Sequence, residues 1–137
     1  MSGRLAVRQG ERSDIAKLRW THRRGGDVWV ISSPLGNEVA RIESGRDGAT
    51  LQRAGAAPET APDFRALTES LLGVALEPRQ IANWLHGPLG GLTTGGWTVE
   101  VKESQRAGAV DIARLIVASR GDTSVRLVVD EYRRLGD

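Results

Sequence analysis

Alternation between apolar and polar residues runs through most of the chain and is interrupted near the middle, where apolar residues recur at helical spacing. Residues 4–8 and 15–22 both alternate in this way. In the second segment, Leu18 and Trp20 share one face and Arg19 lies on the other. A repeat of two residues is typical of strands that bury one face. The pattern therefore predicts an antiparallel sheet with one apolar side.

Turn residues separate several further stretches that have the properties of strands. Residues 28–31 are apolar on both faces, which indicates a strand covered on both sides. Residues 54–62, 87–96 and 105–110 break the alternation, and we predict that they form loops. Besides those already named, strands are predicted at 28–31, 39–43, 49–53, 97–102, 114–119 and 125–132.

Two helices are predicted between the two runs of strands. Asp63 is a suitable N-cap residue for the first helix, and Gly73 is expected to end it. The second helix is predicted over residues 78–86, with Pro78 in its first turn. Their apolar faces hold Phe64, Leu67, Leu71 and Leu72 in the first helix, and Ile81, Trp84 and Leu85 in the second. This order of elements predicts an α+β fold, in which a curved antiparallel sheet is covered on its apolar side by the two helices.

Length and composition exclude several kinds of site. The 137 residues predict a single domain, residues 1–137. No cysteine is present, which excludes disulfides and thiolate metal sites, and two histidines, His22 and His86, are too few for a multi-histidine metal site. We therefore expect no metal and no cofactor. The arginines are scattered along the chain, so nucleic-acid binding is not expected despite a sequence pI of about 9.7.

Sequence signals for catalysis and for a membrane span are both missing. The glycine-rich residues 87–96 join a helix to a strand, which is the wrong order for a phosphate-binding loop. Carboxylates are dispersed singly, and His86 is expected to complement the dipole at a helix end, so we expect no enzyme. No apolar stretch reaches the roughly 20 residues of a spanning helix, and no signal peptide opens the chain. A cytosolic protein and a mature or trimmed form both fit this pattern.

The residues Ser33, Pro34, Leu35 and Gly36 match the preferences of a type I turn, except that leucine occupies the third place. A leucine at a hairpin tip points into solvent unless another part of the chain covers it. Two interpretations stay open at this point. Either another loop packs over the leucine, or the tip is an apolar finger that touches a membrane or a lipid.

Four tryptophans carry most of the aromatic content, since the chain has one phenylalanine and one tyrosine. Trp20 and Trp97 fall on the apolar faces of their strands, and Trp84 falls on the apolar face of the second helix. These side chains could form an ordinary core. Alternatively, they could line a cavity between sheet and helices that is suited to acyl chains.

Taken together, these motifs resemble the LolB family, the outer-membrane lipoprotein receptors of Gram-negative bacteria. The resemblance covers nearly the whole chain. It is most specific where the turn tip Ser33–Gly36 occurs together with the helix that contains Trp84. The matching segments are Arg19–His22, the turn at residues 24–27, Ile31–Gly36 before Val39–Arg41, Ile81–Gly87, Gly96–Glu100 and Val125–Tyr132.

The resemblance implies a half-open β-barrel whose helices enclose an apolar cavity for acyl chains. Such a protein accepts acylated lipoproteins from the periplasmic carrier LolA and inserts them into the lipid of the outer membrane, without covalent chemistry. We expect a monomer at the periplasmic face of that membrane. Leu35, between Pro34 and Gly36, matches the leucine of the family's protruding loop, which is associated with membrane insertion. The residues expected at the acyl-chain cavity are Leu18, Trp20, Trp29, Ile31, Trp84, Leu85, Trp97 and Val99.

Two departures from the family pattern set further expectations. The chain shows no signal peptide, acylated cysteine or preceding segment, so we expect a soluble, trimmed form, with an unanchored relative as the alternative. The segment between Trp84 and Trp97 is short, so one wall of the half-barrel is expected to be reduced. Two other functions also stay open: a lipid or lipoprotein carrier without an insertion role, and a protein-interaction module whose tryptophans form only a core.

Overall fold

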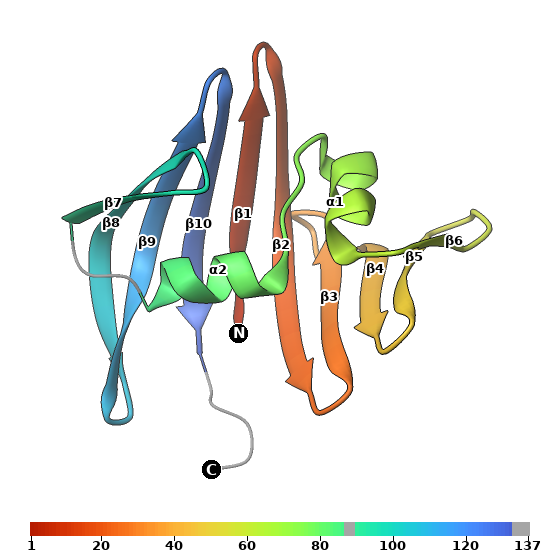
Figure 1. Cartoon of the computed structure of the whole chain (residues 1–137), viewed down its shortest axis with the longest axis horizontal. Coiled ribbons are helices and arrows are strands. Elements are labelled where there is room, and N and C mark those ends of the chain that lie inside the picture. The colour runs from red at the N-terminus through yellow and green to blue at the C-terminus, as the bar shows by residue number, and fades with distance from the viewer. Residues whose placement is uncertain (87–89, 133–137) are drawn as a thin grey trace.

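The computed structural model describes residues 1–86 and 90–132. Within them, ten antiparallel strands form one open sheet in the order β6-β5-β4-β3-β2-β1-β10-β9-β8-β7 (Figure 1). The strands are β1 (Ser2–Gln9), β2 (Arg12–Arg23), β3 (Gly26–Ser32), β4 (Glu38–Gly45), β5 (Gly48–Arg53), β6 (Glu59–Ala61), β7 (Gly90–Thr94), β8 (Trp97–Ala107), β9 (Val110–Arg120) and β10 (Thr123–Glu131).

The first and last strands of the chain meet at the centre of the sheet. β1 pairs with β2 on one side and with β10 on the other, so that Leu5 lies between Ala16 and Leu127. All other neighbouring strands follow one another directly in the sequence. The single long-range pairing of β1 with β10 therefore joins two local meanders into one sheet.

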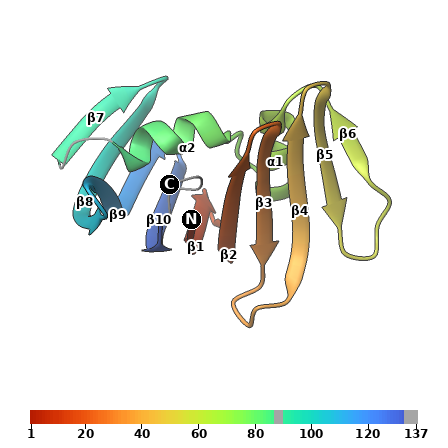
Figure 2. The ribbon, with the colours of Figure 1, turned by 90° about the horizontal axis from the view of Figure 1, so that it is seen from below.

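Both helices lie on the same, concave side of the sheet (Figures 1 and 2). α1 (Phe64–Leu72) packs against β4, β5 and β6, and α2 (Pro78–Leu85) packs against β9. The Asp63 side chain accepts a hydrogen bond of 3.0 Å from the Ala66 amide, and Gly73 ends α1 in the left-handed conformation. The predicted cap and stop residues are confirmed. α2 ends at Leu85, and His86 is its C-cap residue.

Each helix covers its own aromatic pair on the sheet. Under α1, the rings of Phe64 and Trp29 meet edge to face with centroids 4.8 Å apart. At α2, Trp84 and Trp97 meet in the same way at 5.5 Å. Trp29, Trp84 and Trp97 are fully buried, and β3 is buried on both faces as its sequence predicted. The core is therefore a continuous apolar layer between the sheet and the two helices.

The predicted α+β class and curved open sheet are confirmed, but the three predicted loops are wrong in part. Residues 59–61 form β6 and residues 90–94 form β7, while residues 105–107 belong to β8 and residue 110 begins β9. Residues 87–89 of the predicted loop lie outside the described part of the chain. β6 has three residues, too few to show a period, and glycines in β7 pair through their backbone. Register shifts after Val101 break the alternation in β8.

Among the described residues, neither helix has the length and apolar character that crossing a bilayer requires.

Candidate functional site

A pocket of about 620 Å³ opens on the helix side of the sheet, between α2 and the strand ends where the chain begins and where β10 finishes. Its size falls in the range of small-molecule sites, roughly 300–1,000 Å³. The apolar and aromatic part of its wall is formed by Met1, Trp20, Ala82, Leu85 and Tyr132. The polar part is formed by Ser2, Arg19, Thr21, His22, His86 and Glu131.

Two of the eight residues expected at an acyl-chain cavity, Trp20 and Leu85, line this pocket. Trp29 stands behind Trp20 in the neighbouring strand, with the two rings edge to face and their centroids 6.1 Å apart. The other expected residues are packed in the core and are absent from the pocket wall, so their role at a cavity stays a prediction. Those residues are Leu18, Ile31, Trp84, Trp97 and Val99.

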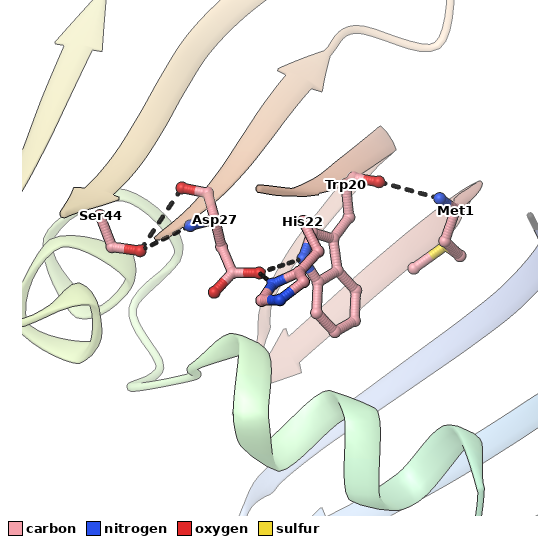
Figure 3. Close-up of polar contacts among 5 residues, drawn as sticks. All are labelled: Met1, Trp20, His22, Asp27 and Ser44. Carbon is pink, nitrogen blue, oxygen red and sulfur yellow. Dashed lines mark hydrogen bonds and ion pairs between the residues drawn. The ribbon is translucent and has the colours of Figure 1, made fainter. Parts of the chain in front are cut away.

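Asp27 fixes the orientation of the Trp20 indole (Figure 3). One Asp27 carboxylate oxygen accepts a hydrogen bond of 2.8 Å from Trp20 Nε1 and lies 2.7 Å from His22 Nδ1. The Asp27 amide in turn donates to the Ser44 hydroxyl, 2.9 Å away. Asp27 is mostly buried, whereas His22 is exposed. The indole N–H is thus held by a residue of β3, and Trp20 lines the pocket.

On another side of the pocket, the end of α2 contacts the residue that follows β10. The Tyr132 hydroxyl lies 3.4 Å from His86 Nε2, and the two rings are nearly perpendicular, with centroids 6.0 Å apart. At the near end, the Met1 amino group donates to the Trp20 carbonyl oxygen at 2.8 Å, and burial lowers the pKa of that amine. The wall of the pocket thus combines apolar side chains with hydrogen-bonding groups.

Sequence reasoning did not identify Tyr132, His86, His22 or Asp27 as site residues. The hairpin between β2 and β3 places His22 directly opposite Asp27 and Trp20 opposite Trp29. That register follows from the position of the turn, so the His22–Asp27 pair could have been found. Tyr132 and His86 meet only because β10 and α2 converge in three dimensions, and no local pattern reports their contact.

The β3–β4 tip has the hydrogen-bonded turn that its sequence predicted. The Gly36 amide donates to the Ser33 carbonyl oxygen at 2.8 Å, and the Ser33 amide donates to the Asn37 carbonyl oxygen at 2.8 Å. Leu35 is 90% exposed, so no described part of the chain packs over it. Figure 2 shows this loop projecting on the face of the sheet that points away from α1 and α2. The pocket and the exposed leucine therefore lie on opposite faces.

The chain is similar to known proteins along nearly its whole length. The family model described as Outer membrane lipoprotein LolB matches residues 1–132. The outer-membrane lipoprotein LolB of Thiobacillus denitrificans is 30% identical to the chain, over 97% of the chain and 78% of the relative. The LolB protein of Cupriavidus necator is 32% identical over 90% and 73%, and that of Dechloromonas aromatica is 28% identical over 97% and 80%. The chain therefore belongs to the LolB family.

Proposed function

We propose that this protein is a receptor that accepts acylated lipoproteins from the periplasmic carrier LolA and inserts them into the outer membrane. The observation that carries the proposal is the pocket of about 620 Å³ whose wall includes Trp20 and Leu85. The family description names outer-membrane lipoproteins, which agrees with the expected location. The chain acts as one domain and as a monomer, and the transfer breaks and forms no covalent bond.

The pocket supplies a driving force for holding acyl chains. Each CH₂ group moved from water into an apolar site is worth about 0.8 kcal/mol, so burying eight to ten of them contributes about 6–8 kcal/mol. The pocket wall also holds the hydrogen-bonding groups of His22, His86 and Tyr132, which could bind the polar linkage of a lipid. Directional transfer requires the pocket to bind cargo more tightly than the carrier does and less tightly than the bilayer does. Roughly 1.4 kcal/mol gives a tenfold preference at each step.

The exposure of Leu35 favours a receptor that inserts its cargo into a membrane over a carrier that only transports it. A soluble carrier gains nothing from a leucine that is 90% exposed at the tip of a rigid turn. In a receptor, the same side chain gains about 1.5–3 kcal/mol when it enters the apolar part of a membrane. The tip therefore holds the protein at the bilayer while the pocket releases its cargo.

The test is a handover assay in which the protein is mixed with carrier loaded with acylated lipoprotein and the cargo is followed by co-purification. Ala82→Trp places a large ring in the pocket from α2, and it should reduce cargo acceptance. The matched control is Asn83→Trp, at the next, exposed position of the same helix, which should leave acceptance unchanged. Equal acceptance by both variants would show that acyl chains bind elsewhere. If the unaltered protein takes neither cargo nor free acylated peptide, the packed-core, protein-interaction interpretation is correct.

A further inference from the structure

A second hollow, of about 590 Å³, lies on the face of the sheet that points away from the helices. It is bounded on one side by the β3–β4 loop, through Gly36, and on the other by β1 and β2. The residues of its wall that carry charge or border the loop are Arg4, Lys17, Arg19, Ser32, Gly36 and Asp130. The hollow shares Ser2 and Arg19 with the wall of the acyl-chain pocket, and the proposed acyl-chain function leaves its other residues unused.

The strand register gathers cations in the hollow. Arg4 of β1 lies directly opposite Lys17 of β2, and both point away from the face that holds the buried Leu5 and Leu18. Arg19 follows on the same face of β2, two residues further along.

Only one of these three cations is neutralised within the described residues. Asp130 accepts hydrogen bonds of 2.9 and 3.2 Å from Arg4, and this carboxylate raises the pKa of Arg4. No acidic side chain of the described chain forms an ion pair with Lys17 or Arg19. The hollow is therefore a cationic site, and Lys17 and Arg19 are exposed there and form no ion pair within 4.0 Å among the described residues.

The excess of positive charge is larger at the centre of this face than on β4. Arg8 of β1 and Arg126 of β10 are exposed and alternate with buried apolar neighbours, so they share the face with Lys17. On β4, by contrast, Arg41 lies 3.3 Å from Glu38 and 3.8 Å from Glu43, which leaves no positive excess there. The cationic strip thus runs over β10, β1 and β2 beside the loop that carries Leu35.

We propose that this hollow binds the phosphate of phospholipid headgroups when Leu35 enters the membrane. Two observations point to a bilayer as the occupant. The cations are complementary to lipid phosphate, and they lie on the same face from which the loop with the exposed leucine projects (Figure 2). One bilayer surface can therefore contact the apolar tip and the cationic strip together. The inference rests on the proposed insertion function and adds a lipid specificity to it.

The test compares binding of the whole chain to phosphatidylcholine vesicles with and without phosphatidylglycerol. Lys17→Glu removes one cation and adds one anion in the hollow. Each unit of charge near an anionic surface changes binding about fivefold, so the variant should bind the anionic vesicles roughly thirtyfold more weakly. Its binding to neutral vesicles should change little. The matched control is Arg79→Glu on α2, which makes the same charge change at an exposed position on the helix side.

Two results would overturn the inference. They are equal binding of Lys17→Glu and the unaltered protein to anionic vesicles, and an equal loss in the Arg79→Glu control. If Lys17→Glu instead loses only the acceptance of cargo from the carrier, the cationic strip binds the carrier protein and not the bilayer. A Leu35→Glu variant separates the two proposals. If Leu35→Glu loses cargo insertion while Lys17→Glu retains it, the proposed insertion function holds and the proposed headgroup binding is refuted. If the unaltered protein binds neither kind of vesicle, both proposals are refuted.

Discussion

Replacing Leu35 with glutamate tests whether an exposed apolar side chain is retained for membrane contact. Because the Leu35 side chain is 90% exposed, the substitution removes almost no folded contact, and the free energy of unfolding should change by less than about 0.5 kcal/mol. Full burial of a leucine side chain is worth about 1.5–3 kcal/mol, and nine-tenths of that area is available to the bilayer. The expected loss is therefore about 1.4–2.7 kcal/mol, or roughly ten- to a hundredfold in vesicle binding.

Vesicle flotation measures the binding, and transfer of cargo from the receptor into vesicles measures insertion. Acceptance of cargo from the carrier should be unchanged in Leu35→Glu, since the tip and the pocket lie on opposite faces. Leu35→Met is the matched control, because it keeps an apolar side chain of similar size and should bind like the unaltered protein. Normal insertion by Leu35→Glu, with an unchanged melting temperature, would refute the role of the tip and favour a carrier function.

Three further substitutions test the framework that holds the site. Gly26 has a φ of +154°, and in Gly26→Ala the added Cβ atom would clash with the Ser44 carbonyl oxygen. Thermal denaturation should therefore show that the free energy of unfolding falls by about 1–3 kcal/mol. An unchanged melting temperature would mean that β4 moves to make room for the methyl group. Thr68→Val removes the hydroxyl oxygen that accepts a hydrogen bond of 2.7 Å from the buried Leu76 amide. Urea denaturation should show that the free energy of unfolding falls by about 1–3 kcal/mol. No change would mean that a water molecule replaces the hydroxyl. Trp29→Ala empties a fully buried position and should cost about 3–5 kcal/mol in the same assay; a much smaller cost would indicate that the layer under α1 collapses to fill the space.

Local signals explain why much of the framework could be predicted. The Asp63 cap, the Gly73 stop and the turn at Ser33–Gly36 depend on groups within a few residues of one another, so their patterns are complete in the sequence. The alternation that places Trp20 on the inner face is equally local. The glycine-containing β7 has no such alternation. It forms a strand through backbone pairing with β8, and its sequence did not predict this strand.

The candidate site was only partly predictable because its wall comes from distant parts of the chain. Trp20 and Leu85 could be named from their apolar faces, but they meet Tyr132 only after β10 pairs with β1. Sequence reasoning also named all four tryptophans as candidates for the cavity wall. Tertiary packing separates them, since α1 covers Trp29 and the α2 region covers Trp97, while Trp20 stays partly open.

The sequence by itself determined the α+β class, the helix ends and a leucine placed at the tip of a rigid turn, because each depends on interactions between near neighbours. The tertiary structure alone decided that the tip and the pocket lie on opposite faces of the sheet. It also decided that Lys17 and Arg19 border the hollow beside that tip. Both outcomes depend on the curvature of the sheet, on which face α2 crosses and on the pairing of β1 with β10. Such long-range contacts form between residues whose spacing along the chain carries no periodic signal.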